Sequence, residues 1–471
     1  MIRDLYKACC YGALESDVML ICPLDYRYGR NEMKSVFSEE SRLKSQLLVE
    51  AALARAHAAV GNIPIESANE ITAKANLDNV SLERVKEIEA ETKHDIMAMV
   101  KALSDQCGDA GKYVHLGATS NDIVDTAAAL EIKAALEIIE ADLDEFICTL
   151  VKLSYAHRDT VEIGRTHGQF AIPTTFGFKI AGYVSEMMRH YERLQEIKRR
   201  ACVGKMSGAI GTGAGFADKF FEIQEKVMAD LGLGVEDAAT QIVCRDRYAE
   251  LVFLLGLITT SCERYATEVR NLQRSEIGEV SEAFDAKKQV GSSTMAQKRN
   301  PMLSENVCGL ARIVRSYIAP QMESMILWHE RDLTNSSAER FILTHSMALT
   351  DDILNKINNV FSHIEVHSYN MQRNISSSNG FIMAESVLLT LSSKGIGRQN
   401  AHELVRQISI RAESEGKSLR DALLENSEVM KLVTESELDA ALDPNSYVGS
   451  APQMVDKIVA DAEKLLGKRI V

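Results

Sequence analysis

The scarcity of helix-breaking residues constrains this chain more than any other feature. It has only 7 prolines and 27 glycines in 471 residues, so long stretches run without interruption. Within them, apolar residues recur every three to four positions, which is the spacing of a helix with one buried face. The longest such patterns cover residues 121–156, 173–200, 246–276, 301–328 and 337–366. We therefore expect an all-α fold.

Helices of this length indicate an extended central bundle, because they exceed the usual range of roughly 8–20 residues. Their apolar faces are too large to be covered within one subunit, so we expect an oligomer built through the bundle. Shorter helical patterns come before and after them, which predicts three domains over residues 1–120, 121–367 and 368–471. The first 18 residues are interpreted as an extension that precedes the start of the protein proper at Met19.

Charge and cysteine usage exclude several classes of function. The formal net charge of −14 argues against a nucleic-acid partner, because neutralising phosphates needs an excess of Lys and Arg. The nine cysteines are scattered and form no CxxC pair, which indicates free thiols in the cytoplasm and no zinc or redox motif. The most apolar stretch, 252–258, is far shorter than the ~20 residues that span a bilayer, so no membrane association is expected.

Metal binding is not expected either. His363 and His367 have the spacing of two metal ligands on a helix, but no third ligand is evident near them. We interpret both histidines as structural.

The connection over residues 291–301 is the strongest candidate for a functional site. It begins with glycine and ends with proline, so it cannot be the interior of a helix. Its polar side chains supply hydroxyl and amide donors and a fixed positive charge, as an anionic substrate requires: Ser292, Ser293, Lys298 and Asn300. Composition alone leaves a solvated loop between helices equally open.

A second candidate is His167, within the loop over residues 164–169. A histidine next to glycine in a loop can approach a ligand and exchange protons near neutral pH. Taken alone, a histidine of this kind is more often structural.

Thr119 and Ser120 stand where the helix over 121–156 begins. Asp122 follows Thr119 by three residues, which is close to a capping box. Capping is the simpler interpretation of these residues. The alternative is that the hydroxyls and free N–H groups there hold a carboxylate or a phosphate.

Two arginines accompany another predicted helix start. Ser336 and Glu339 match an S-x-x-E cap, so Arg331 and Arg340 are expected to flank the N-terminus of a helix. Two guanidinium groups at the positive end of a helix could bind a phosphate, so we expect a phosphate site there.

Taken together, these loops resemble the sequence motifs of a known superfamily. Residues 291–301, GSSTMAQKRNP, resemble the long and specific GSSxMPxKxNP signature of the aspartase/fumarase superfamily. Further segments are similar to one family within it, the adenylosuccinate lyases, from about residue 23 to the end. They lie at 23–29, 93–95, 164–167, 240–241, 245–247, 336–340, 394–398 and 442–444.

Three residues depart from the pattern of that family. Ala296 replaces the proline of the signature, which leaves the loop less restricted. Cys244 and Tyr248 stand where the family has Gln and His. Because the polar residues of the signature are intact, these departures bear on substrate specificity more than on the type of reaction.

The resemblance implies an anti β-elimination that releases fumarate, without a cofactor or a metal. The substrates would be adenylosuccinate, which gives AMP, and SAICAR, which gives AICAR, in purine biosynthesis. It implies Ser292 as the base and His167 as the general acid, with His94 as an orienting or phosphate-binding partner. Lys298 would support the serine alkoxide or bind a substrate carboxylate. The other implied substrate-binding residues are Arg27, Tyr28, Asp95, Thr119, Ser120, Gln241, Ser293, Asn300, Arg331, Ser336 and Arg340.

The resemblance also implies a homotetramer in which each active site takes loops from three subunits. Two rival interpretations stay open at this point. One is another fumarate-releasing lyase of the superfamily that acts on a different amine substrate. The other is a non-enzymatic helical protein built on the same fold.

Overall fold

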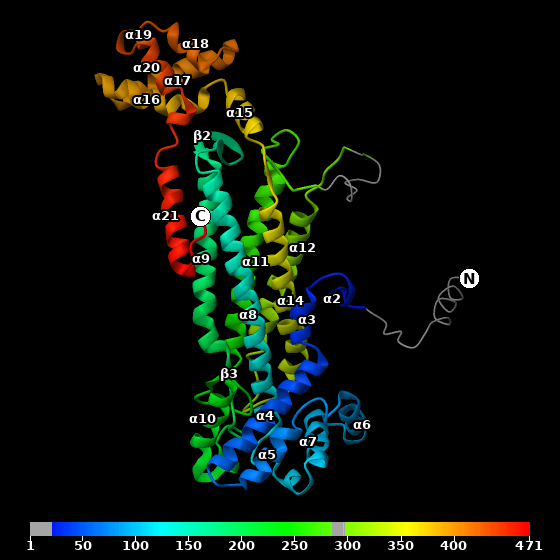
Figure 1. The fold of residues 1–471 in the computed structure, drawn as a ribbon. Helices are drawn as coiled ribbons and strands as arrows, with labels where there is room; N and C mark the ends of the chain where they lie inside the picture. Colours follow the sequence, from blue (N-terminus) through cyan, green and yellow to red (C-terminus); the bar gives the residue numbers. More distant parts are fainter. Residues whose placement is uncertain (1–20, 285–294, 296) are drawn as a thin grey trace, which may run out of the picture.

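The computed structural model describes residues 21–284, 295 and 297–471. The chain forms an elongated bundle of long helices with a smaller helical group at each end (Figure 1). The bundle consists of α8 (Ser120–Ala156), α9 (Phe176–Ala201), α11 (Asp246–Leu272), α12 (Met302–Ser316), α13 (Ile318–Glu323) and α14 (Thr334–Ser362). The predicted all-α fold is confirmed.

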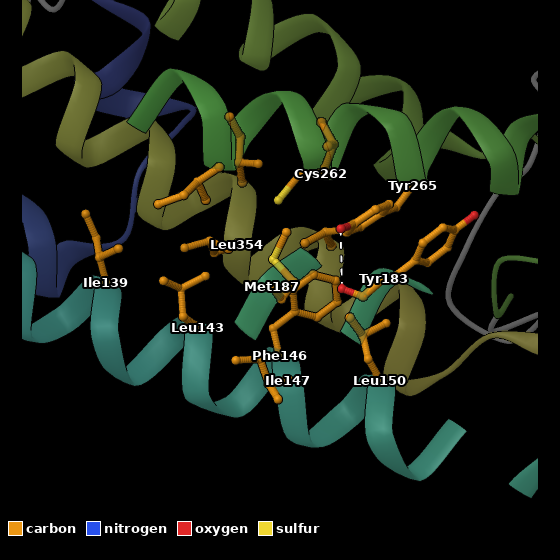
Figure 2. Close-up of a cluster of buried hydrophobic side chains, with 14 of the residues drawn as sticks. Ile139, Leu143, Phe146, Ile147, Leu150, Tyr183, Met187, Cys262, Tyr265 and Leu354 are labelled. Carbon is orange, nitrogen blue, oxygen red and sulfur yellow. Dashed lines mark hydrogen bonds between the residues drawn. The ribbon is translucent and has the colours of Figure 1, made fainter. Parts of the chain in front are cut away.

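Side chains from four of these helices meet in the centre of the bundle (Figure 2). The contribution of α8 is a stripe spaced by three and four residues, and its members are fully buried: Ile139, Leu143, Phe146 and Leu150. The ring of Tyr183 on α9 stacks on that of Tyr265 on α11, with centroids 4.1 Å apart. The Tyr265 hydroxyl donates a hydrogen bond of 3.4 Å to the Tyr183 carbonyl oxygen. These contacts make the bundle one continuous core.

A group of shorter helices covers the end of the bundle where α8 begins. It comprises α4 (Glu39–Ala59), α5 (Ile65–Lys74), α6 (Leu82–Thr92), α7 (Asp95–Gln106), η1 (Gly108–Tyr113), η2 (Ala214–Lys219) and α10 (Phe220–Leu231). The short helices α2 (Pro23–Tyr26) and α3 (Asn31–Val36) lead into it along the side of the bundle (Figure 1). The Ser38 hydroxyl caps α4 by accepting from the Ser41 N–H at 3.1 Å.

The other end carries the helices that follow the bundle. They are α15 (Ser368–Ser377), η3 (Phe381–Met383), α16 (Ala384–Leu391), η4 (Ser392–Ile396), α17 (Arg398–Glu415), α18 (Leu419–Leu424), α19 (Val429–Leu432), α20 (Glu435–Ala441) and η5 (Pro444–Ser446). The last helix, α21 (Ala451–Leu466), leaves this group and packs along α9 (Figure 1).

Three small two-stranded sheets add to the helices. In the first, β1 (Val161–Thr166) pairs antiparallel with β2 (Gln169–Thr175). In the others, β3 (Val203–Gly204) pairs parallel with β4 (Gly234–Val235), and β5 (Val280–Ser281) pairs antiparallel with β6 (Glu365–Val366). The first sheet delays the predicted helix over 173–200, which begins at Phe176. A break at Tyr317 likewise divides the predicted helix over 301–328 into α12 and α13.

The described cysteines are unpaired, and they include Cys107, Cys202, Cys262 and Cys308 in buried positions. Within the ranges given above, no helix is long and apolar enough to cross a membrane.

Candidate active site

The predicted site residues lie at the two ends of the bundle. Thr119 and Ser120 stand at the start of α8, whereas His167 lies in the turn between β1 and β2, beyond the other end of that helix. Since α8 has 37 residues and a helix rises ~1.5 Å per residue, the two places are about 55 Å apart. Within one chain, these residues cannot contact the same small molecule.

A cavity of about 330 Å³ opens at the end of the bundle where α8 begins. Of the predicted residues, those that line it are Asp95, Arg331, Ser336 and Arg340. Gln241 lies beside them, because Arg331 Nη1 donates a hydrogen bond of 3.0 Å to its Oε1 atom. The Gln241 N–H also donates to the Glu330 carbonyl oxygen at 3.3 Å. The structure therefore brings these predicted residues together.

A buried arginine that was assigned no role in the sequence analysis organises this cavity. Arg245 donates to Asp125 Oδ2 on α8 at 2.8 Å and to Glu339 Oε1 on α14 at 3.1 Å. All three side chains are buried. Burial raises the pKa of Glu339, and the Arg245 guanidinium opposes that shift. The same Asp125 carboxylate accepts from the Val243 N–H at 2.8 Å, which fixes the loop that carries Gln241.

The cap predicted at Ser336 is wrong. Helix α14 begins at Thr334, whose N–H donates to Asp332 Oδ1 at 2.8 Å, so Ser336 already lies in the first turn. Glu339 turns inward to Arg245 instead of returning to the helix start. The S-x-x-E spacing also places two residues on one face of a helix, which is the arrangement found here.

The capping box at Thr119 is confirmed. Its N–H donates to Asp122 Oδ2 at 2.8 Å, and its side chain accepts from the Asp122 N–H in return. The buried Asp122 carboxylate also accepts from the Ser207 N–H at 2.9 Å and pairs with the buried Lys205 ammonium at 2.5 Å. The start of α8, including Ser120, is thus held rigidly by internal contacts.

His94 and Asp95 stand at the start of α7, at the same end of the bundle. The His94 ring caps that helix by accepting from the Met97 N–H at 3.4 Å, and it is largely exposed. Its Nδ1 atom lies 3.6 Å from Asp95 Oδ1.

Arg27 and Tyr28 are not in this cavity within one chain. The Tyr28 ring packs under Lys356, whose Nζ atom lies 4.9 Å from the ring centroid, and Arg27 is exposed. Lys356 stands 22 residues beyond Thr334 on α14, which corresponds to about 33 Å along the helix.

His167 occupies a tight hairpin turn at the far end of the bundle. Thr166 pairs with Gln169, so the turn consists of His167 and Gly168 alone, with φ of 55° and 74°. Positive φ at both central positions is the conformation of the type I′ hairpin turn, which strongly favours glycine at the second of them. The turn leaves the His167 ring exposed.

Lys298 and Asn300 stand just before α12, at the same end as the hairpin. Lys298 is exposed, and its N–H donates to the Met295 carbonyl oxygen at 3.0 Å. The predicted base Ser292, its neighbour Ser293 and the departure at Ala296 lie outside the described residues.

The other two residues that depart from the family pattern, Tyr248 and Cys244, have different surroundings. Tyr248 is buried in the cavity wall, where the Arg245 guanidinium lies 4.9 Å from its ring centroid. Cys244 is exposed. Among the described residues, no group of three or more His, Cys, Asp or Glu side chains could hold a metal ion.

Comparisons with known proteins identify the family. The model of a lyase family matches residues 25–315, and one described as the adenylosuccinate lyase C-terminus matches residues 380–458. The chain is 54% identical to the adenylosuccinate lyase of Pyrococcus abyssi over 95% of its length and 99% of that protein. It is 41% identical to the adenylosuccinate lyase of Aquifex aeolicus, over 92% and 99%.

Solved structures of related enzymes share the fold. A 3-carboxy-cis,cis-muconate lactonizing enzyme from Pseudomonas putida superposes with a TM-score of 0.85 at 32% identity, over 94% of this chain and 99% of that one. A fumarate lyase from Mesorhizobium sp. BNC1 gives 0.85 at 33% identity, over 94% and 98%. The chain therefore belongs to the adenylosuccinate lyase family, within the aspartase/fumarase superfamily.

Proposed function

We propose that this enzyme releases fumarate from adenylosuccinate to give AMP, and from SAICAR to give AICAR, in purine biosynthesis. The observation that carries the proposal is 54% identity to a curated adenylosuccinate lyase over nearly the whole of both chains. The arginines of the cavity at the start of α8 fit the same substrates, because both are nucleotides with a phosphate.

In the proposed reaction, Ser292 removes the proton beside a substrate carboxylate, and the C–N bond to the departing nitrogen breaks. His167 delivers a proton to that nitrogen, so the amine leaves neutral and the succinyl part leaves as fumarate. The intermediate carries extra negative charge on the carboxylate, which Lys298 and the donors at Thr119, Ser120 and Asn300 would stabilise. The chain's own side chains supply the acid, the base and the charge stabilisation.

We further propose that the enzyme is a homotetramer with composite sites. His167 and the Arg331 cavity are too far apart to act together within one chain, so another copy must supply one of them. Exposed apolar side chains lie near both His167 and Arg331, as an interface between copies requires. Phe170 and Ile172 beside His167 are 48% and 44% exposed, and Ile326 and Trp328 beside Arg331 are 75% and 76% exposed.

A direct assay tests the proposed reaction. Purified enzyme is incubated with adenylosuccinate or SAICAR, and beside them with argininosuccinate or aspartate, while fumarate formation is followed. We expect turnover of both nucleotides, and its loss in His167→Ala and in Ser292→Ala. Turnover of an amino-acid substrate without turnover of either nucleotide would overturn the assignment.

A further inference from the structure

Near the turn that carries His167, a buried ion pair ties the hairpin to the body of the protein. Arg165 lies two residues before His167 and makes a bidentate contact with Glu279: Nη1 donates to Oε2 at 2.9 Å, and Nη2 to Oε1 at 2.7 Å. Glu279 is fully buried, and Arg165 is only 16% exposed. The fork geometry fixes the angle between the two planar groups as well as their separation.

The hairpin itself offers little freedom around this anchor. Its register shifts between Ile163 and Arg165, and the guanidinium of Arg165 lies 5.6 Å from the centroid of the Phe170 ring on the opposite strand. At Gly164, a Cβ atom would come within 2.7 Å of the Ile172 carbonyl oxygen, so only glycine allows the strands to approach this closely. The position of His167 therefore follows from that of Arg165.

Glu279 is fixed from other sides too. Asn374 Nδ2 on α15 donates to Glu279 Oε1 at 2.7 Å and to the Ile277 carbonyl oxygen at 3.0 Å. Asn370 Nδ2 on the same helix donates to the Gly278 carbonyl oxygen at 2.7 Å. The His367 N–H donates to the Glu279 carbonyl oxygen at 2.9 Å. The carboxylate thus joins the hairpin, the segment after α11 and the first helix beyond the bundle.

We propose that Arg165 and Glu279 are positioning residues that hold His167 where it can protonate the leaving nitrogen. This inference rests on the proposed function, in which His167 is the general acid. Neither residue needs to touch the substrate, because both side chains point into the protein. A displacement of about 1 Å at a catalytic group can lower a rate on the order of 100-fold, so a loosened hairpin should affect the chemical step before it affects binding.

The test compares kcat and KM for adenylosuccinate across variants of the tetramer. Arg165→Ala and Glu279→Gln should each lower kcat by roughly 10- to 100-fold while KM changes by less than about threefold. Arg165→Lys should recover only part of the loss, because it lacks the bidentate fork. Added guanidinium ion should raise kcat of Arg165→Ala selectively. Arg158→Ala is the matched control, since it breaks an exposed pair with Asp456 at the same end of the bundle.

Two results would overturn the inference. One is an unchanged kcat in both Arg165→Ala and Glu279→Gln. The other is a rise in KM as large as the fall in kcat, which added guanidinium ion does not reverse. If Arg165→Ala does not assemble, Asn374→Ala decides, because it removes one hydrogen bond to Glu279 without leaving a charge unpaired. It should lower kcat by a smaller factor, and an unchanged kcat there would count against the proposal. An active His167→Ala variant would instead refute the role of His167 as the general acid, and an enzyme that turns over neither nucleotide would refute the proposed function itself.

Discussion

Arg331 and Gln241 are 90 residues apart in the sequence, yet a hydrogen bond of 3.0 Å joins Arg331 Nη1 to Gln241 Oε1 in one wall of the cavity. Neither residue is held by its own helix, because each lies in the loop that precedes one. The buried contacts of Arg245 with Asp125 and Glu339 determine where these two loops meet.

The first prediction concerns Arg331 as a phosphate ligand. Arg331→Ala should raise KM for adenylosuccinate and SAICAR by roughly ten- to a hundredfold, because a hydrogen bond to a charged group contributes about 1.5–3 kcal/mol. Arg331→Lys should restore the charge but not the fork, and so recover affinity only in part. Steady-state kinetics on both nucleotides check this. Arg55→Ala, which breaks an exposed pair with Asp230, is the control and should leave KM unchanged.

A second prediction concerns the stability that depends on Arg245. Arg245→Ala leaves the carboxylates of Asp125 and Glu339 buried without their partner, and breaking a buried pair in this way costs about 3–5 kcal/mol. We expect a clear fall in the denaturation midpoint in urea. Arg200→Ala breaks an exposed pair with Glu250 and should shift the midpoint little. Equal effects in the two variants would contradict the structural role of Arg245.

The third prediction uses the carboxyl group of Glu162 on β1. Burial raises its pKa from 4.5 to about 7, and the ammonium of Lys179 at 3.3 Å only partly offsets this. Between about pH 4.5 and pH 7, the Glu162 carboxyl group is therefore protonated in the folded protein but ionised in the unfolded chain. This contribution to stability is fully present below about pH 4.5, and it is lost as the pH rises through 7.

The Glu162→Gln variant has an amide at this position, which does not titrate in this pH range. Between pH 4.5 and pH 8, the stability of the variant relative to the wild type should rise by up to about 3 kcal/mol. Urea unfolding of both proteins at a series of pH values measures this difference. A difference that stays constant across the range would show that Glu162 does not titrate there.

The helices could be predicted closely from the sequence because their signals are local. The apolar spacing from 121 to 156 and the capping box at Thr119 specify α8 within a residue of its observed start. The hairpin that carries His167 was missed, although a residue followed by glycine at 167–168 is a turn signal that could have revealed it. Short strands beside long helices give too little periodicity to be recognised.

Local sequence patterns could identify candidate site residues, but not the contacts that bring them together within the chain. Arg331, Ser336 and Arg340 were identified from their own segment, and they do line one cavity. The pairing of Arg245 with Asp125 joins residues 120 positions apart, so no local pattern contains it. Glu339 was taken for a cap because the same spacing serves a helix end and a helix face.

The central claim is that one active site uses His167 of one copy and the Arg331 cavity of another. The most direct measurement mixes His167→Ala with Arg331→Ala in equal amounts, after subunit exchange has been verified by native mass spectrometry. The substrate concentration is kept well below the raised KM, so that each variant alone is nearly inactive. If the two residues come from different copies, about a quarter of the sites receive both intact, and activity should approach a quarter of the wild-type value. If each site used one chain alone, every site would carry a lesion, and mixing would restore nothing.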